Sequence, residues 1–345
     1  METYEILRDL AIILFFAKLC GMLARKCKAP QVVGQIIAGL LIGPCCLGLI
    51  SQSDFIAKMA EIGVILVMFS AGLETDLKDL VKTGPKAFAI ACSGVFIPFV
   101  CGALLYFAFY GFGGIGSAAF FEAISIGAIL TATSVSITVA SLQELGKLKG
   151  PVGTTILSSA IIDDVIGIIV LTIVIGFKDT AVKPSMIVIK TVLFFIVAFI
   201  GGFLAYKAFK WLDNRNPHTQ RIPIFGFVLC FGLAYIAEKY FGIADITGAY
   251  TAGIILCNLK DADYINTKAH ISTYMIFAPI FFVGIGLKTT FSAMDTKFLL
   301  FSVSFVVVAL LTKIIGCGLM AKVCRFNWPD SLKIGVGMMT RGEVA

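Results

Sequence analysis

The sequence predicts an all-α integral membrane protein, and three observations lead to that fold class. Hydrophobic residues make up 59% of the 345 residues and charged residues only 14%, whereas a soluble domain carries about 25% charged residues. Apolar runs longer than the roughly 20 residues that a helix needs to cross a bilayer recur along the chain. Short segments with Pro, Gly and charged residues separate these runs. An ordinary soluble domain is therefore excluded.

Twelve membrane-spanning segments follow when the Pro, Gly and charge clusters are taken as boundaries. They are predicted near residues 4–25, 30–50, 55–74, 85–110, 116–142, 150–177, 185–209, 222–240, 243–259, 268–288, 297–321 and 331 onward. The sequence stops at RGEVA within an apolar segment. We therefore expect about 13 spans in the full protein and about 12 here, with truncation before the last span.

The basic residues orient this stack of helices, because Lys and Arg are retained in short cytoplasmic loops. Most of the basic residues outside the spans fall in the odd-numbered loops, for example Arg25, Lys147 and Arg221. The N-terminus is thus predicted outside, and it lacks the basic leader and cleavage site of a signal peptide. The net charge of +7 follows from this bias and needs no nucleic-acid partner. Cysteines that lie mostly singly in apolar runs predict reduced packing residues in the inner (plasma) membrane.

Two adjacent carboxylates stand inside the apolar run SSAIIDDVIGIIV, residues 158–170. An aspartate at mid-helix costs about 2.5–3.5 kcal/mol on insertion scales. Such a pair therefore marks a functional-site candidate. Neighbouring helix positions point about 100° apart, so Asp163 and Asp164 cannot face one cavity equally and should have different roles.

The fifth predicted span contains a hydroxyl-rich stretch, TATSVSIT, residues 131–138. Hydroxyls such as Thr131, Thr133 and Ser134 can satisfy backbone groups where a membrane helix unwinds, and unwound carbonyls can bind a small cation. The alternative is an intact helix whose hydroxyls bond back to their own turn.

A second interrupted span favours unwinding. Residues 331–345, SLKIGVGMMTRGEVA, combine three glycines with the charges of Arg341 and Glu343. One broken segment in each half of the chain points to a transporter with inverted repeats. We predict one transmembrane domain over 1–345, with repeat one at about 1–178, a linker helix at about 185–210 and repeat two at about 220–345.

Motifs along nearly the whole chain resemble the monovalent cation:proton antiporters, the sodium/proton exchanger superfamily, and within it the double-aspartate branch. The motifs are PQVVGQIIAGLLIGP (30–44), FSAGLETDL (69–77), TATSVSITVASLQELGKL (131–148), SSAIIDDVIG (158–167), GAYTAGIIL (248–256), APIFFVGIGL (278–287), LTKIIGCGL (311–319) and MTRGEV (339–344). Gln35 departs from the pattern, since relatives often carry a glutamate there.

The resemblance implies a transporter that is not an enzyme, needs no cofactor and forms a homodimer in the lipid bilayer. It also implies two discontinuous helices that cross near the aspartates. Asp164 would bind the monovalent cation or a proton, with Asp163, Thr131, Thr133 and Ser134 in the ion site. Arg341 and Glu343 would offset helix-end dipoles at the second break.

Lys313 is the expected charge partner of Asp163, because a lysine in VVVALLTKIIGCG is otherwise unpaired in lipid. The alternative is that Lys313 snorkels to an interface. For Lys18 and Lys190 we expect snorkelling or local pairing. If the cation breaks the Asp163–Lys313 pair, one proton leaves Lys313 and another leaves Asp164. Exchange of two protons for one cation would be electrogenic.

Other classes of protein share parts of this pattern. An intramembrane aspartyl protease has its aspartates in YD and GxGD contexts, which are absent here. A potassium/proton antiporter or a ligand-gated potassium efflux system of the same superfamily is the closer alternative. Carboxylates, hydroxyls and carbonyls suit any hard monovalent cation. We favour sodium or lithium.

Overall fold

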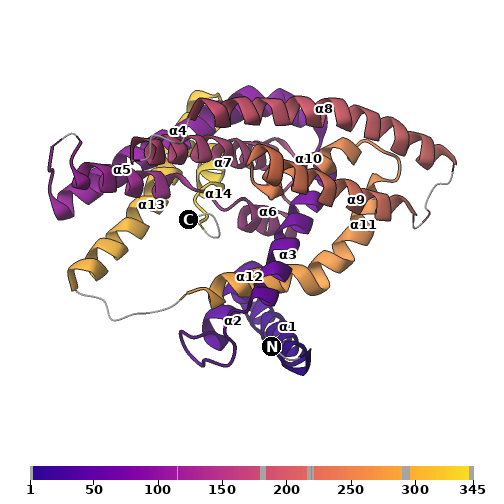
Figure 1. Cartoon of the computed structure of the whole chain (residues 1–345), viewed down its shortest axis with the longest axis horizontal. Helices are drawn as coiled ribbons and strands as arrows, with labels where there is room; N and C mark the ends of the chain where they lie inside the picture. The colour runs from indigo at the N-terminus through magenta and orange to yellow at the C-terminus, as the bar shows by residue number, and fades with distance from the viewer. Residues whose placement is uncertain are drawn as a thin grey trace. The chain divides into compact units, whose positions relative to one another are not determined.

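The computed structural model describes residues 3–114, 116–178, 184–215, 219, 221–289 and 296–341 (Figure 1). Every regular element in these ranges is a helix. Eight helical stretches there are long and apolar enough to cross a membrane: Asp54–Glu74, Leu77–Tyr110, Ala118–Glu144, Pro151–Leu171, Val188–Trp211, Arg221–Phe241, Ala262–Leu287 and Thr296–Val323. Large apolar side chains such as Phe199 and Val306 are exposed on these helices, as expected for surfaces that face lipid.

Each of the twelve predicted spans coincides with a helix or with consecutive helices, although several bounds differ. The second span is predicted to reach residue 50, but α2 (Gln31–Ile42) stops before Gly43 and Pro44. The fourth is predicted to start at residue 85, but α4 (Leu77–Tyr110) begins at the N-cap Asp76 and continues through Pro85 and Pro98. How many of the twelve cross the membrane stays a prediction.

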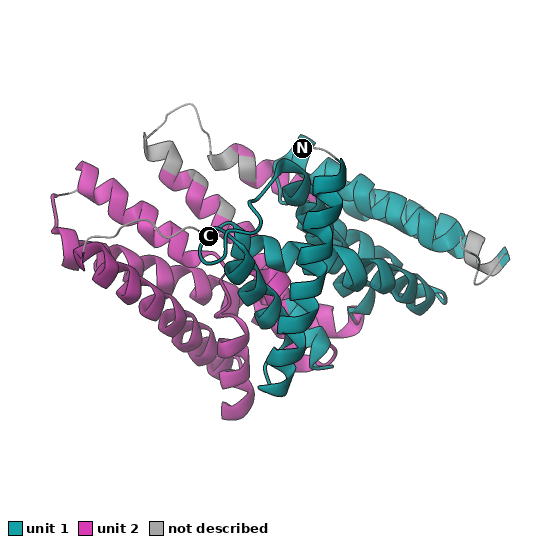
Figure 2. Cartoon of the chain, turned by 90° about the horizontal axis from the view of Figure 1, so that it is seen from below, with its two compact units in different colours: residues 1–75, 139–147, 195–292 teal, residues 76–138, 148–194, 293–345 magenta. Residues whose placement is uncertain are grey.

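The chain divides into two compact units (Figure 2). The first comprises residues 1–75, 139–147 and 195–292, and the second residues 76–138, 148–194 and 293–345. Two helices, α6 (Val135–Glu144) and α8 (Pro184–Arg215), contribute residues to both units.

The first unit is built on close helix packing at glycines. It contains α1 (Thr3–Lys26), α2, α3 (Asp54–Glu74), α9 (Arg221–Ile236), the π-helical turn η1 (Ala237–Phe241), α10 (Asp245–Leu256), α11 (Ala262–Ser272), the π-helical turn η2 (Thr273–Phe277) and α12 (Ala278–Leu287). A Cβ on Gly39 of α2 would lie 2.1 Å from the carbonyl oxygen of Val283 on α12. A Cβ on Gly253 of α10 would lie 2.4 Å from the carbonyl oxygen of Phe69 on α3. Only glycine allows these backbones to approach so closely.

The same packing pattern occurs twice in this unit. Gly34 of α2 lies against the backbone of α1 at Cys20, and Gly248 of α10 lies against the backbone of α9 at Leu233. Gly34 is as far from Gly39 in the sequence as Gly248 is from Gly253. Helix α2 thus contacts α1 and α12 through the same two glycine positions by which α10 contacts α9 and α3, as a repeated fold requires. The exact repeat boundaries remain a prediction.

The second unit contains α4, α5 (Ala118–Thr131), the start of α6, α7 (Pro151–Lys178), α13 (Thr296–Val323) and α14 (Trp328–Gly337). Helix α4 packs against α5, α7 and α13, and α14 packs against α13 and α7. All the residues predicted to form the ion site belong to this unit.

Candidate ion-binding site

The first predicted break is present between α5 and α6. Helix α5 ends at Thr131, α6 begins at Val135, and Ala132 is extended, with φ −58° and ψ 134°. Thr131 donates its hydroxyl to the carbonyl oxygen of Ala128 at 2.7 Å, and the hydroxyl of Ser134 accepts the N–H of Ile137 at 3.4 Å. The hydroxyls therefore satisfy backbone groups at the two helix ends, and the intact-helix alternative is wrong.

The second break follows α14, and it is hydrogen-bonded to the first. Ser134 donates its N–H to the carbonyl oxygen of Thr340 at 3.0 Å, and the hydroxyl of Thr340 donates to the carbonyl oxygen of Ser134 at 2.9 Å. The hydroxyl of Thr138 donates to the carbonyl oxygen of Gly337 at 3.1 Å. The two segments in which breaks are predicted therefore meet.

Arg341 joins the end of α5 in this junction to α13. Its guanidinium donates to the carbonyl oxygen of Ala132, the C-cap residue of α5, and to that of Ala309 on α13 at 3.2 Å. A cation at a helix C-terminus opposes the negative end of the helix dipole, so the position of Arg341 fits the predicted structural role. Glu343 lies outside the described residues.

Asp163 and Lys313 form a buried ion pair between α7 and α13. The ammonium Nζ of Lys313 lies 2.6 Å from Oδ1 of Asp163. Lys313 is 0% exposed and Asp163 is 1% exposed. The predicted pairing is present in the structure, and Lys313 does not snorkel.

Asp164 is also buried, with 8% of its surface exposed, and it occupies the next position around α7. Gly167 lies one turn further along α7, where at about 100° per residue it points between the directions of Asp163 and Asp164. A Cβ on Gly167 would lie 3.7 Å from the hydroxyl oxygen of Thr131. The side of α7 between the two aspartates therefore faces the end of α5, where the first break begins.

The remaining predicted ion-site hydroxyls are buried in the break itself. Thr133 and Ser134 are both 0% exposed. The hydroxyl of Thr133 has no hydrogen-bond partner within the part of the chain that the structure describes. A buried hydroxyl oxygen without a hydrogen-bond partner can still accept a hydrogen bond or bind a cation.

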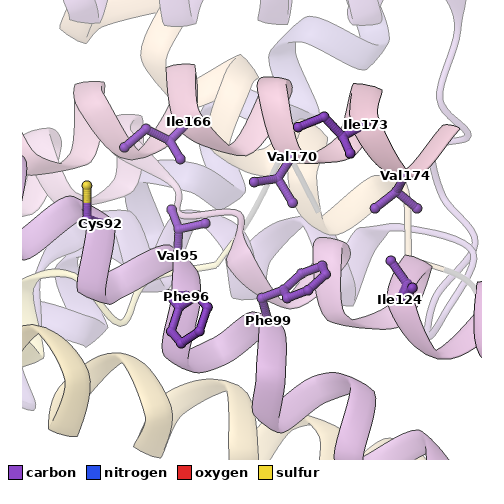
Figure 3. A pocket seen from close by; sticks show the side chains of 9 residues that line it. All are labelled: Cys92, Val95, Phe96, Phe99, Ile124, Ile166, Val170, Ile173 and Val174. Carbon is purple, nitrogen blue, oxygen red and sulfur yellow. The ribbon is translucent and has the colours of Figure 1, made fainter. Parts of the chain in front are cut away.

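The ion pair is bordered by apolar side chains along α7. Ile166 and Val170 follow Asp163 by one and two turns, and they face Val95 and Phe99 of α4 across a cavity of about 550 Å³ (Figure 3). The side chains that line this cavity carry no charge. It therefore offers no oxygen ligands for a cation, and we exclude it from the candidate ion site.

Sequence reasoning missed several residues around these groups. Thr340 donates one of the hydrogen bonds that join the two breaks. Its position beside Arg341 in a glycine-rich segment could have indicated this role from the sequence. Gly94 and Cys317 lie against the ion pair, but nothing in the sequence distinguishes them from other small residues. Lys18 is exposed on α1, and its snorkelling or local pairing stays a prediction. Nothing in the structure explains Gln35.

Two interrupted helices that are bonded at their breaks, beside buried carboxylates and a buried lysine, define a secondary transporter. Residues 11–345 match the family described as "Sodium/hydrogen exchanger, transmembrane". The chain belongs to this family of transporters. It is a multi-pass membrane protein and a cation:proton antiporter with the inverted-repeat antiporter fold.

Relatives match nearly the whole chain. The probable Na(+)/H(+) antiporter GerT of Bacillus cereus is 39% identical over 341 residues, which cover 98% of this chain and 88% of the relative. The Na(+)/H(+)-K(+) antiporter GerN of the same organism is 37% identical over 344 residues, covering 99% and 86%. The sodium proton antiporter MjNhaP1 of Methanocaldococcus jannaschii shares the fold, with a TM-score of 0.70 at 17% identity over 98% of this chain and 85% of that chain.

Proposed function

We propose that this antiporter exchanges two protons for one sodium or lithium ion, with Asp164 as the group that binds the cation and a proton in turn. The buried Asp163–Lys313 pair beside Asp164 is the observation that carries the proposal. A cation that reaches Asp164 displaces its proton. The added positive charge also destabilises the neighbouring ammonium of Lys313, which releases the second proton.

The oxygens of the first break supply the remaining ligands. Thr131, Thr133 and Ser134 are buried hydroxyl residues at the end of α5 and in the break that follows it, and Thr131 lies near Gly167 of α7. Hydroxyl and carboxylate oxygens suit a hard monovalent cation. Asp163, held by Lys313, contributes charge to the site without binding the cation directly.

Sodium is preferred to potassium because the relatives GerT and an Enterococcus hirae protein, 34% identical over 350 residues, are named Na(+)/H(+) antiporters. GerN, whose name includes K(+), supports potassium as the second candidate. The test is proton flux in proteoliposomes of the purified protein, with sodium, lithium and potassium chloride added in turn. Flux with sodium and lithium at concentrations where potassium gives none supports the proposal, and the reverse order favours the second candidate.

We place the protein in the inner (plasma) membrane with its N-terminus outside, following the distribution of basic loops. Cys27 and Cys46 are both exposed, one on each side of α2. In inside-out vesicles a membrane-impermeant maleimide should label a single-cysteine variant that keeps Cys27 and not one that keeps Cys46. The opposite pattern would reverse the orientation.

The resemblance to the superfamily supports a homodimer as the functional assembly. Native mass spectrometry of the detergent-solubilised protein should give twice the mass of one chain. A monomer that retains full exchange activity after reconstitution at one chain per vesicle would contradict this assembly.

A further inference from the structure

Gly94 of α4 lies against both partners of the buried ion pair. A Cβ at this position would stand 3.3 Å from Oδ1 of Asp163 and 3.4 Å from Nζ of Lys313. It would also stand 2.7 Å from Sγ of Cys317, one turn after Lys313 on α13. The hydrogen atoms of this glycine therefore occupy the space between α4 and the two charged atoms that are in contact at 2.6 Å.

The helices around the pair have little freedom to make room for a larger residue. Ser93 of α4 donates its hydroxyl to the carbonyl oxygen of Gly316 on α13 at 3.0 Å. Ser159, one turn before Asp163 on α7, donates to the carbonyl oxygen of Ala87 on α4 at 3.1 Å. These bonds fix α4 to the helices of both partners, at Ser93 next to Gly94 and at Ala87 two turns before it. A methyl group on residue 94 would have to displace side chains, because moving either helix would break a buried hydrogen bond.

We infer that Gly94 is a positioning residue for the exchange reaction: the absence of a side chain there allows the Asp163 carboxylate and the Lys313 ammonium to remain in direct contact. The inference rests on the proposed function, in which this pair controls release of the second proton. The attraction between two charges falls with their separation. A side chain at residue 94 that lengthens the contact therefore weakens the attraction between Asp163 and Lys313. Replacement of the lysine by a neutral residue removes this attraction completely.

The test compares Gly94→Ala with wild type and with Lys313→Gln in proteoliposomes. Sodium-driven proton flux is measured at zero potential and at about 100 mV negative inside, because a voltage response reports the net charge moved in each cycle. Gly84→Ala is the matched control, since Gly84 lies on the same helix and a Cβ there meets nothing within 4 Å. Gly94→Ala should lose part of the voltage response and move toward the Lys313→Gln value, whereas Gly84→Ala should keep the wild-type response.

A double variant shows whether the effect passes through the ion pair. In the Lys313→Gln background, adding Gly94→Ala should cause no further change in the voltage response. If Gly94→Ala does not fold, the double variant Gly94→Ala/Cys317→Ala, which removes the sulfur at 2.7 Å, is measured in its place and should show the same partial loss.

The design distinguishes failure of the positioning role of Gly94 from failure of the two-for-one exchange. An unchanged voltage response in a transporting Gly94→Ala protein, next to a voltage-dependent wild type, overturns the positioning role alone. Equal losses with and without Lys313 also overturn it, because the substitution would then act through general packing. A wild type without any voltage response contradicts the two-for-one exchange itself.

Discussion

The ammonium of Lys313 lies 2.6 Å from a carboxylate oxygen of Asp163, while Asp164 occupies the next position around the same helix. Consecutive helix positions differ by about 100° in direction, so the lysine that faces Asp163 cannot face Asp164 equally. Two carboxylates that are neighbours in the sequence therefore have different surroundings. Asp163 has a counter-charge in direct contact, and Asp164 points in another direction from the same helix.

Replacement of Asp164 by asparagine is expected to abolish exchange while the protein still folds and inserts. The amide keeps the shape of the side chain but can neither carry the proton nor bind the cation as an anion. Proton flux on addition of sodium should fall to the level of empty liposomes.

Asp54→Asn is the control for this substitution, because Asp54 is an exposed carboxylate at the start of α3. It should retain wild-type flux. A well-folded Asp164→Asn protein with wild-type flux would remove Asp164 from the ion site.

Arg341→Met is expected to destabilise the junction of the two breaks. The substitution keeps an apolar stem of similar length but leaves the carbonyl oxygens of Ala132 and Ala309 without their charged donor. Loss of a partly buried charge-assisted hydrogen bond costs about 1–3 kcal/mol of unfolding free energy. Thermal unfolding of the purified protein should shift to lower temperature, and transport should fall with it.

Lys333→Met on α14 is the matched control. Lys333 pairs with Asp330 at 2.8 Å, but its side chain is 65% exposed, and surface pairs contribute about 0–1 kcal/mol. If both variants unfold at the wild-type temperature, Arg341 has no structural role at the break.

Gly253→Ala is expected to destabilise the first unit, although the same change stabilises an exposed helix by about 0.5–1 kcal/mol. The added methyl group would lie 2.4 Å from the carbonyl oxygen of Phe69 and 2.7 Å from Cα of Gly72. Overpacking of this kind costs about 1–3 kcal/mol. Gly232→Ala on α9, where a Cβ meets nothing within 4 Å, should leave the unfolding temperature unchanged or raise it. Equal behaviour of the two variants would show that α3 and α10 do not need their close approach.

The sequence predicts much of the ion site because membrane burial makes polar residues conspicuous. A lysine or an aspartate inside an apolar helix must find a partner, so the sequence predicts that Lys313 pairs with a buried aspartate. The choice of Asp163 rather than Asp164 comes from the resemblance to the family. Hydroxyl and glycine clusters likewise identify the two breaks, since an unwound membrane helix needs side chains that satisfy its backbone.

Other features depend on tertiary contacts that leave no such trace. Gly94 looks like any small residue of a membrane helix, and its role appears only when α7 and α13 place two charges beside it. Backbone carbonyls have no sequence signature at all. The carbonyl oxygen of Ala309, for example, accepts a hydrogen bond from Arg341. Pro85 predicts a helix boundary, yet α4 passes through it. Proline disrupts only part of the hydrogen-bond ladder, and membrane helices tolerate it where other groups replace the lost bond.

The most direct test of the account is the voltage response of proton flux in the wild type and in Lys313→Gln. Proteoliposomes are clamped at zero and then at about 100 mV, a difference that is worth about 2.3 kcal/mol for each charge moved. The wild type should respond to the potential because two protons exchange for one cation, while Lys313→Gln should still exchange but respond far less. Voltage-insensitive exchange in the wild type, or an undiminished response in Lys313→Gln, would contradict the role assigned to the Asp163–Lys313 pair.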